Sequence, residues 1–290
     1  MKENISVVVV NYNSGDLLHE CITSILQSSI SASIIVVDNA SSDHSLESIA
    51  HFDLVTIIKN KSNLGFSVAC NIGLRHSSCR TILFLNPDCV LNEKALELMQ
   101  EELYSQPDIG MVGGLLLNQD GSEQAGGRRM VPTPWRSFTR AVGLYRFENR
   151  WPSLFKDFYL HLKPLPPVAI DVEAISGACM LIRKTDVELV GEWDEGYFLH
   201  CEDLDWCMRF RKEGKRVRFV PKAKVFHVLS ACSRKRPIFV EWHKHKGMVR
   251  FYRKFFRHQY PLLLMYLVIA GVWLRFSIVA LKKVLFGLVK

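Results

Sequence analysis

The chain of 290 residues lacks the short motifs that would identify a cofactor directly. No two of its eight cysteines have C-x-x-C spacing, so we expect no zinc site. Most of the cysteines fall in apolar or helical stretches, which is typical of small buried residues in a reducing cytosol. Neither the G-x-G-x-x-G nor the P-loop pattern occurs, so a nucleotide, if the chain binds one, must be held in another way. Residues 1–4 lead directly into an apolar run, and we expect no signal peptide.

The first half contains apolar runs that are continuous, in contrast to the alternating pattern of half-exposed strands. They are Ile5–Val10, Ile34–Val37, Leu54–Ile58 and Thr81–Leu85. Continuous runs of this length predict parallel strands buried on both faces. Apolar residues recur at helical spacing in residues 16–28, and we expect another helix over residues 66–75. The order predicts a doubly wound α/β sheet.

Polar residues follow each of these runs. Ligands bind beyond the carboxyl ends of the strands in such sheets. We expect four side chains to gather at that edge: Asn11, Asp38, Asn63 and Asp88. Carboxylates there suit Mg²⁺ or Mn²⁺. Two alternatives stay open, because Asp38 and Asp43 are also helix-capping types and Asn86-Pro87-Asp88 is also a turn sequence.

A second acidic site follows the aromatic pair Tyr197-Phe198. Residues 200–205 read His-Cys-Glu-Asp-Leu-Asp, just before an expected helix. Apolar surroundings tune a carboxylate toward general-base chemistry. We therefore expect one acidic site to hold a metal and the other to move a proton.

The motifs together carry a family resemblance over residues 5 to 230. They are Val9–Asn13, Val36–Asp43, Asn63–Phe66 with Asn71, Leu85–Asp88, Ser176–Met180, and Glu202–Asp205 with Arg209. This ordered set resembles the GT-A glycosyltransferases of family two, especially their bacterial rhamnosyltransferase-like branch. The resemblance implies a Rossmann-like, mostly parallel central sheet flanked by helices. It also implies inverting transfer of a sugar from a nucleotide diphosphate donor to an acceptor hydroxyl.

The resemblance also implies roles for individual residues. The expected nucleotide-binding residues are Asn11, Asp38, Asn63, Gly65, Asn71 and Asn86. Asp88 would bind the Mg²⁺ or Mn²⁺ ion that bridges the diphosphate, and Asp203 would deprotonate the acceptor hydroxyl. Many relatives have aspartate where this chain has Asn86, so strict metal dependence stays open. His227 either completes the metal site or is structural.

The remaining candidates are supporting residues. Glu202 and Asp205 either assist at the site or serve the helix dipole. Arg209 either forms a salt bridge with one of them or helps to hold the diphosphate, and Gly177 belongs to a matched motif. His243 and His245 lie in a basic stretch, and we interpret them as surface residues.

The pattern changes twice in the second half. Residues 124–168 form an irregular insertion that contains Gly126-Gly127-Arg128-Arg129, and in relatives this region helps to form the acceptor side. We therefore expect a catalytic domain over residues 1–230, a basic amphipathic helix over 231–260 and an apolar membrane-associating tail over 261–290.

The tail combines basic and apolar residues. A basic run from Arg234 to Arg257 precedes an uncharged stretch from Leu262 to Leu274, which Arg275 ends. A deep arginine is costly in a membrane span, so we favour a helix lying in the inner membrane surface. A single span with a snorkelling Arg275 and a soluble dimerisation helix are the alternatives. The net charge of +8 is explained by the membrane surface, and no nucleic-acid-binding motif occurs.

These observations predict a glycosyltransferase at the cytoplasmic face of the cell membrane, acting on a lipid-linked or envelope-polysaccharide acceptor. The family resemblance implies rhamnose from dTDP-rhamnose as the leading donor, and a UDP-hexose is the alternative. A catalytically silent membrane scaffold is a rival, against which the intact Asp88 and Asp203 argue. A sugar-nucleotide pyrophosphorylase would need a glycine- and basic-rich first loop, which residues 11–15 do not supply. The oligomeric state is not predicted.

Overall fold

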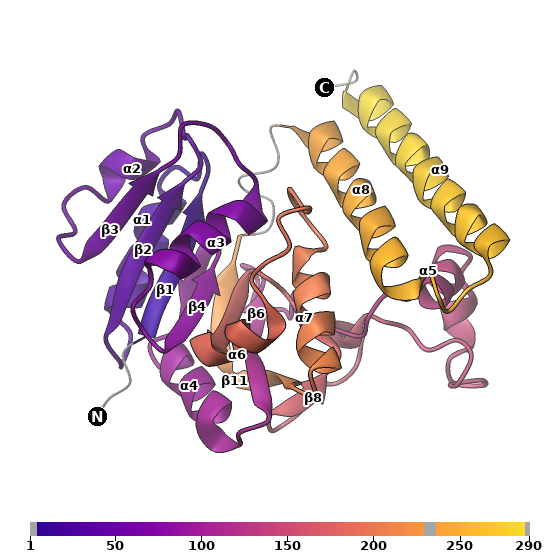
Figure 1. Cartoon of the computed structure of the whole chain (residues 1–290), viewed down its shortest axis with the longest axis horizontal. Helices are drawn as coiled ribbons and strands as arrows, with labels where there is room; N and C mark the ends of the chain where they lie inside the picture. Colours follow the sequence, from indigo (N-terminus) through magenta and orange to yellow (C-terminus); the bar gives the residue numbers. More distant parts are fainter. Residues whose placement is uncertain (1–4, 229–235, 288–290) are drawn as a thin grey trace.

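The structure is a computed structural model that describes residues 5–228 and 236–287 (Figure 1). Its first half follows the predicted alternation of strands and helices. The elements are β1 (Ile5–Asn11), α1 (Leu17–Leu26), β2 (Ala32–Asp38), α2 (Ser45–Ser48), β3 (Val55–Lys59), α3 (Phe66–His76) and β4 (Thr81–Leu85). The four strands are parallel neighbours in the order β3-β2-β1-β4. Asn11 pairs with Asp38 at the carboxyl edge, as the sequence predicts.

The second half completes the sheet with strands of both directions. It contains β5 (Cys89–Leu91), α4 (Ala95–Ser105), β6 (Ile109–Leu117), β7 (Arg128–Arg129), α5 (Pro134–Ala141), η1 (Leu144–Phe147), η2 (Leu160–Leu162), β8 (Ile170–Val172), β9 (Ala174–Ile175), β10 (Cys179–Arg183), α6 (Lys184–Val190), α7 (Glu202–Lys212) and β11 (Arg216–His227). β10 is antiparallel to both β4 and β6, whereas β11 is parallel to β6. The large sheet is therefore mixed, with its parallel half at the N-terminal end, and β7 and β9 form a separate two-stranded sheet.

Helices cover both faces of the sheet and give two hydrophobic cores. One core contains residues of α3 and α7, and the other contains residues of α1 and α4. Six of the seven cysteines that the structure describes are buried, and Cys232 lies outside the described residues. Burial of these thiols agrees with their interpretation as small core residues.

A helical hairpin forms the C-terminal part of the described chain. It consists of α8 (Pro237–Phe256) and α9 (Leu262–Gly287), which lie side by side (Figure 1). The inner face of α8 is part of the first core, because Phe251, Tyr252 and Phe255 are buried there. The predicted boundary at residue 230 stays a prediction. Arg234 and Lys235, which begin the predicted basic run, lie outside the described residues.

The surface interpretation of two histidines is wrong for His245. Its side chain is 5% exposed and its ring lies 5.5 Å from the Phe276 ring, between α8 and α9. His243 is partly buried and lies 4.4 Å from the Phe198 ring. The basic neighbours of His245 indicated a solvent-exposed position. One face of a basic helix can still contribute to a core, and His245 lies on that face.

Candidate active site

Asn11 and Asp38 form a buried network at the edge of the parallel strands. Asn11 Nδ2 donates to Asp38 Oδ1 at 2.8 Å and to Ser45 Oγ at 2.9 Å, and Ser14 Oγ donates to Asn11 Oδ1. Asp38 also accepts from the amide and hydroxyl of Ser41, at 3.1 and 2.6 Å. Both side chains are at least 97% buried. Through these hydrogen bonds Asn11 holds the loop that follows Asp38 in place. Asp43, which lies one residue before the N-cap of α2, accepts from the Ser45 amide at 3.2 Å and from the Gly15 amide at 2.8 Å.

The loop before α3 is fastened to the strand edge and to the acidic segment. Asn63 Oδ1 accepts from the Gly65 amide at 3.0 Å, and the Gly65 carbonyl accepts from Asn39 Nδ2 at 3.2 Å. Gly65 has a φ of 89°, and a Cβ there would lie 2.8 Å from the Phe198 carbonyl oxygen. Only glycine allows this close approach. Asn39 is a residue that the sequence did not single out.

Asn71 holds α3 against the loop that precedes α7. Its Nδ2 donates to the Trp193 carbonyl and to Glu195 Oε1, both at 2.9 Å, and its Oδ1 accepts from the Trp193 amide at 3.0 Å. The side chain is 1% exposed. Asn71 therefore connects α3 to the loop that contains Trp193 and Glu195.

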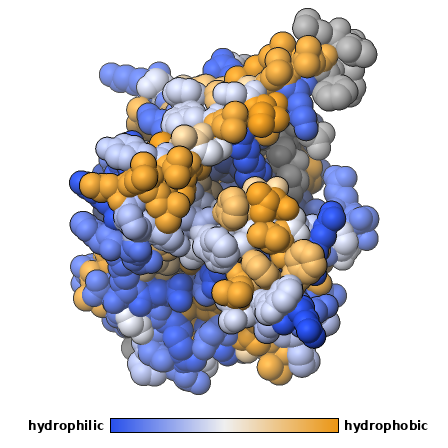
Figure 2. All heavy atoms as spheres, turned by 90° about the vertical axis from the view of Figure 1, so that its right-hand side faces the viewer, coloured by the Kyte–Doolittle hydropathy of each residue, from blue (hydrophilic) through white to orange (hydrophobic). Residues whose placement is uncertain are grey.

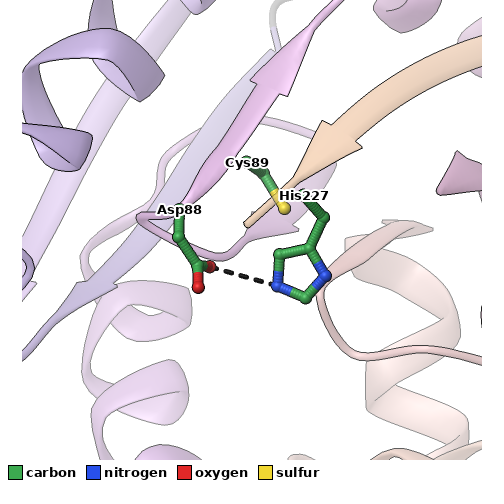
Figure 3. A group of neighbouring side chains, drawn as sticks. All are labelled: Asp88, Cys89 and His227. Atoms are coloured by element: carbon green, nitrogen blue, oxygen red, sulfur yellow. Dashed lines mark ion pairs between the residues drawn. The ribbon is translucent and has the colours of Figure 1, made fainter. Parts of the chain in front are cut away.

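Asp88 and His227 meet where β4 and β11 end (Figure 3). Asp88 Oδ1 lies 3.1 Å from His227 Nε2 and makes no hydrogen bond to the described residues. Ligand atoms of Asp88, Cys89 and His227 lie within 4.8 Å of one another. Burial and the neighbouring Asp88 raise the pKa of the Cys89 thiol, so Cys89 is a poor ligand for a hard cation.

Gln124 sets the tautomer of His227. Its Oε1 accepts from His227 Nδ1 at 2.6 Å, while its Nε2 donates to the carbonyl of His227 and to Asn118 Oδ1, each at 3.2 Å. A proton on Nδ1 leaves the Nε2 lone pair of a neutral imidazole directed at the carboxylate. Two facing acceptors favour a cation between them, so Asp88 and His227 fit a divalent metal. Asn86 Nδ2 lies 3.5 Å from the same nitrogen.

Asp203 lies in the first turn of α7. Two residues with positive φ, His200 at 69° and Cys201 at 72°, turn the chain into this helix. Asp203 forms an ion pair with Arg129 of β7 and accepts from the Gly177 amide at 3.3 Å. Arg129 Nε is buried and has no hydrogen-bond partner among the described residues. Sequence reasoning placed Arg129 only within the acceptor-side insertion, and its pairing with Asp203 was missed.

The two acids beside Asp203 have different surroundings. Glu202 is 7% exposed, and burial together with the neighbouring Asp203 raises its pKa to about 8. Asp205 is fully buried and bonded to Arg209 Nε at 2.7 Å, Lys254 Nζ at 2.7 Å and the Tyr197 hydroxyl at 3.1 Å. The salt bridge of Arg209 is therefore present, with Asp205 as its partner.

A comparison with known families decides the classification. Residues 6–184 match the model of "Glycosyl transferase family 2". The chain belongs to glycosyl transferase family 2. The match ends before α7, so the roles of Asp203 and His227 stay predictions.

Relatives of this family 2 glycosyltransferase include rhamnosyltransferases. The chain is 27% identical over 241 residues to the N-acetylglucosaminyl-diphospho-decaprenol L-rhamnosyltransferase of Mycobacterium tuberculosis, covering 78% of this chain and 76% of that protein. It is 23% identical over 262 residues to the dTDP-rhamnosyl transferase RfbF of Shigella flexneri, covering 87% and 78%. The predicted resemblance to the rhamnosyltransferase-like branch is confirmed.

Solved structures share its GT-A fold. The mannosyltransferase PcManGT from Pyrobaculum calidifontis, in complex with GDP-Man and Mn²⁺, has a TM-score of 0.60 at 17% identity, covering 94% of this chain and 70% of that chain. GalNAc-T7 with UDP, GalNAc and Mn²⁺ has a TM-score of 0.62 at 18% identity and covers 87% of this chain. This chain spans about half of GalNAc-T7, 48% of its length. The predicted fold class is confirmed.

Proposed function

We propose that this glycosyltransferase moves a sugar with inversion from a nucleotide diphosphate donor to a hydroxyl of a lipid-linked or envelope-polysaccharide acceptor. The observation that carries the proposal is the pairing of Asp88 Oδ1 with His227 Nε2 at 3.1 Å, at the sheet edge where nucleotides bind in α/β folds. Asp203 supplies a second carboxylate, on a separate element. Asp88 would act on the leaving diphosphate through the metal, and Asp203 would act on the attacking hydroxyl.

The leading donor is dTDP-rhamnose. The printed names of the Mycobacterium and Shigella relatives, which include rhamnosyl transfer and an acceptor on diphospho-decaprenol, support this donor and a lipid-linked acceptor. A UDP-hexose is the second candidate. The nucleotide would lie over Asp38, Asn63 and Gly65. Asn11 and Asn71 would hold the segments that carry these residues in place.

Asp88 and His227 would hold Mg²⁺ or Mn²⁺. When bound, the ion stabilises the negative charge that develops on the leaving diphosphate. Asn86 adds an amide in place of a further carboxylate, which predicts a modest affinity for the metal. Gln124 keeps the His227 ring oriented, with Nδ1 as the hydrogen-bond donor.

Asp203 would accept the proton of the attacking hydroxyl. In the structure its Oδ2 is paired with Arg129, so this ion pair must open before that oxygen acts as a base. The absence of a side chain at Gly177 lets its backbone approach Asp203, because a Cβ there would lie 3.3 Å from the Cβ of Asp203. The hydroxyl would then attack the sugar from the face opposite the leaving diphosphate. This single displacement gives inversion.

The proposed location is the cytoplasmic face of the membrane, with α9 lying in the membrane plane. Residues Leu262–Leu285 of α9 are long and apolar enough to cross a membrane. α8 lies alongside, with the Trp242 and Trp273 rings 4.9 Å apart and Lys283 3.2 Å from Glu241. A perpendicular span would draw the charges of α8 toward the hydrocarbon core, which is costly. Hydrophobic patches occupy the upper and central part of the face that carries the hairpin (Figure 2).

Helical spacing explains Arg275 in this arrangement. Arg275 and Lys282 are seven residues apart and share one line along α9. The exposed residues Leu267, Leu274 and Leu281 share another line, about 100° away. An in-plane helix therefore buries the leucine line in lipid and keeps both cations at its edge, near the head groups.

The insertion over residues 124–168 is proposed as the acceptor side. It places Arg129 on Asp203, and it lines a hollow of about 700 Å³ together with Tyr260, which precedes α9. We keep the division into a catalytic domain over 1–230, a basic helix over 231–260 and an apolar tail over 261–290.

A donor panel tests the proposal. Thermal stabilisation by dTDP-rhamnose, UDP-hexoses and GDP-mannose is measured with Mn²⁺, with Mg²⁺ and with a chelator, followed by the anomeric configuration of the product on a polyprenyl-diphosphate acceptor. Stabilisation by one donor and an inverted product support the proposal. Binding without turnover for every donor would favour the rival function, a silent membrane scaffold.

A further inference from the structure

A cationic hollow lies between the two helices of the C-terminal hairpin and the loop that leads to α7. Its volume is about 570 Å³. It is lined by Gly196, Lys246, Val249, Arg250, Arg253, Lys254 and Trp273. The four basic side chains come from one helix, α8, at spacings of three, four and seven residues, which place them along one side of that helix.

Two of these cations are already neutralised. Arg250 Nη2 lies 2.8 Å from Asp194 Oδ1, and Lys254 Nζ lies 2.6 Å from Asp194 Oδ2 and 2.7 Å from Asp205 Oδ2. These ion pairs hold α8 against α7 and against the loop that precedes it. Lys246 and Arg253 are exposed and form no ion pair with the described residues. The hollow therefore keeps two positive charges for a ligand.

The hollow adjoins both α9, the proposed membrane helix, and the segment that leads to Asp203 in α7. Trp273 of α9 forms one wall, and tryptophan is favoured at the boundary between lipid and water. On the other side, a Cβ on Gly196 would lie within 3 Å of the Arg250 guanidinium, so the two segments are in close contact. Arg250 also lies over the ring of Tyr197, whose hydroxyl donates to Asp205 of α7.

We propose that this hollow binds the phosphate group of a membrane lipid, through Lys246 and Arg253, beside the apolar surface of α9. The inference rests on the proposed membrane placement of α9. Two lipids share the required chemistry: the diphosphate of a polyprenyl-linked acceptor and the head group of an anionic phospholipid. Basic side chains bind both by charge. A lipid held here has its chain next to α9 and its head group next to the segment that leads to Asp203.

The test compares the full-length wild type with the double variant K246Q/R253Q, which removes only the two unpaired cations. The matched control, K94Q/K222Q, removes two exposed lysines that lie outside the hairpin, at the start of α4 and on β11. Binding is measured by flotation with vesicles of phosphatidylcholine alone, with added phosphatidylglycerol, or with added polyprenyl diphosphate at equal phosphate charge. Hydrolysis of the donor in solution is measured for each protein.

The affinity of K246Q/R253Q for phosphate-bearing vesicles should fall by about 30-fold, the loss expected for two basic side chains at an anionic surface. The control should bind like the wild type. A larger loss with polyprenyl diphosphate identifies the acceptor as the ligand, and an equal loss identifies the phospholipid head group. Wild-type binding by K246Q/R253Q, or an equal loss in the control, overturns the proposal. Donor hydrolysis that persists in that case leaves the proposed function standing. A loss of vesicle binding confined to K246Q/R253Q supports the lipid site whatever the donor panel shows, so the two proposals fail separately.

Discussion

Replacing Glu202 by glutamine should stabilise the protein, and the gain should grow as the pH rises. Glu202 is buried beside Asp203, and its Oε2 has no hydrogen-bond partner among the described residues. Burial and the charge of Asp203 raise its pKa from the ordinary 4.5 to about 8. Glutamine has nearly the shape of the protonated acid and never becomes charged.

The sign follows from proton linkage. The folded protein binds the Glu202 proton more tightly than the unfolded chain does. This contribution to stability is therefore complete below about pH 4.5, and it is lost as the pH rises through about 8. At about 1.36 kcal/mol per pH unit, ionisation lowers the free energy of unfolding by up to about 5 kcal/mol.

Urea unfolding in a mild detergent at pH 5, 7 and 9 measures this effect. The difference between E202Q and the wild type should be small at pH 5 and reach about 3 to 5 kcal/mol at pH 9. E101Q, which changes an exposed glutamate of α4, should follow the wild type at each pH. Parallel pH dependence of the wild type and E202Q would refute the claim that Glu202 is held in its protonated form.

Three further predictions concern the proposed chemistry and the tail. Asp203→Asn should lower the transfer rate by about 10²- to 10⁴-fold while donor affinity stays within a few-fold, measured by single-turnover kinetics and calorimetry, because the amide accepts no proton; turnover near the wild-type rate would move the role of base elsewhere. His227→Ala or Asp88→Ala should weaken donor binding at least tenfold with Mn²⁺ and much less in chelator. An equal loss under both conditions would make the pair structural. Ending the chain before Pro261 should preserve donor hydrolysis and abolish transfer to a vesicle-bound acceptor, and high salt should then release the protein from anionic vesicles. A truncated chain that is insoluble and fails to bind donor would show that α9 stabilises the fold by covering α8.

The sequence predicted much of the N-terminal half, because the information there is local. A continuous apolar run is buried on both faces wherever it lies, so residues 5–10 and 34–37 predict parallel strands without knowledge of their neighbours. The ends of parallel strands share one edge, which is why Asn11 and Asp38 meet as predicted. Glycine at position 65 has a positive φ and closely approaches Phe198, and the resemblance had already placed that residue in the nucleotide loop.

Only the tertiary structure decided which side chains meet across long stretches of chain. Arg129 and Asp203 are 74 residues apart, and Gln124 and His227 are 103 residues apart, so no local pattern pairs them. His245 was assigned to the surface because its neighbours are basic, yet it is buried where α8 packs against α9. Periodicity identifies the apolar face of a helix, but what covers that face depends on elements distant in sequence. The charge state of Glu202 has the same origin, because burial is a property of the folded chain and no residue type fixes it alone.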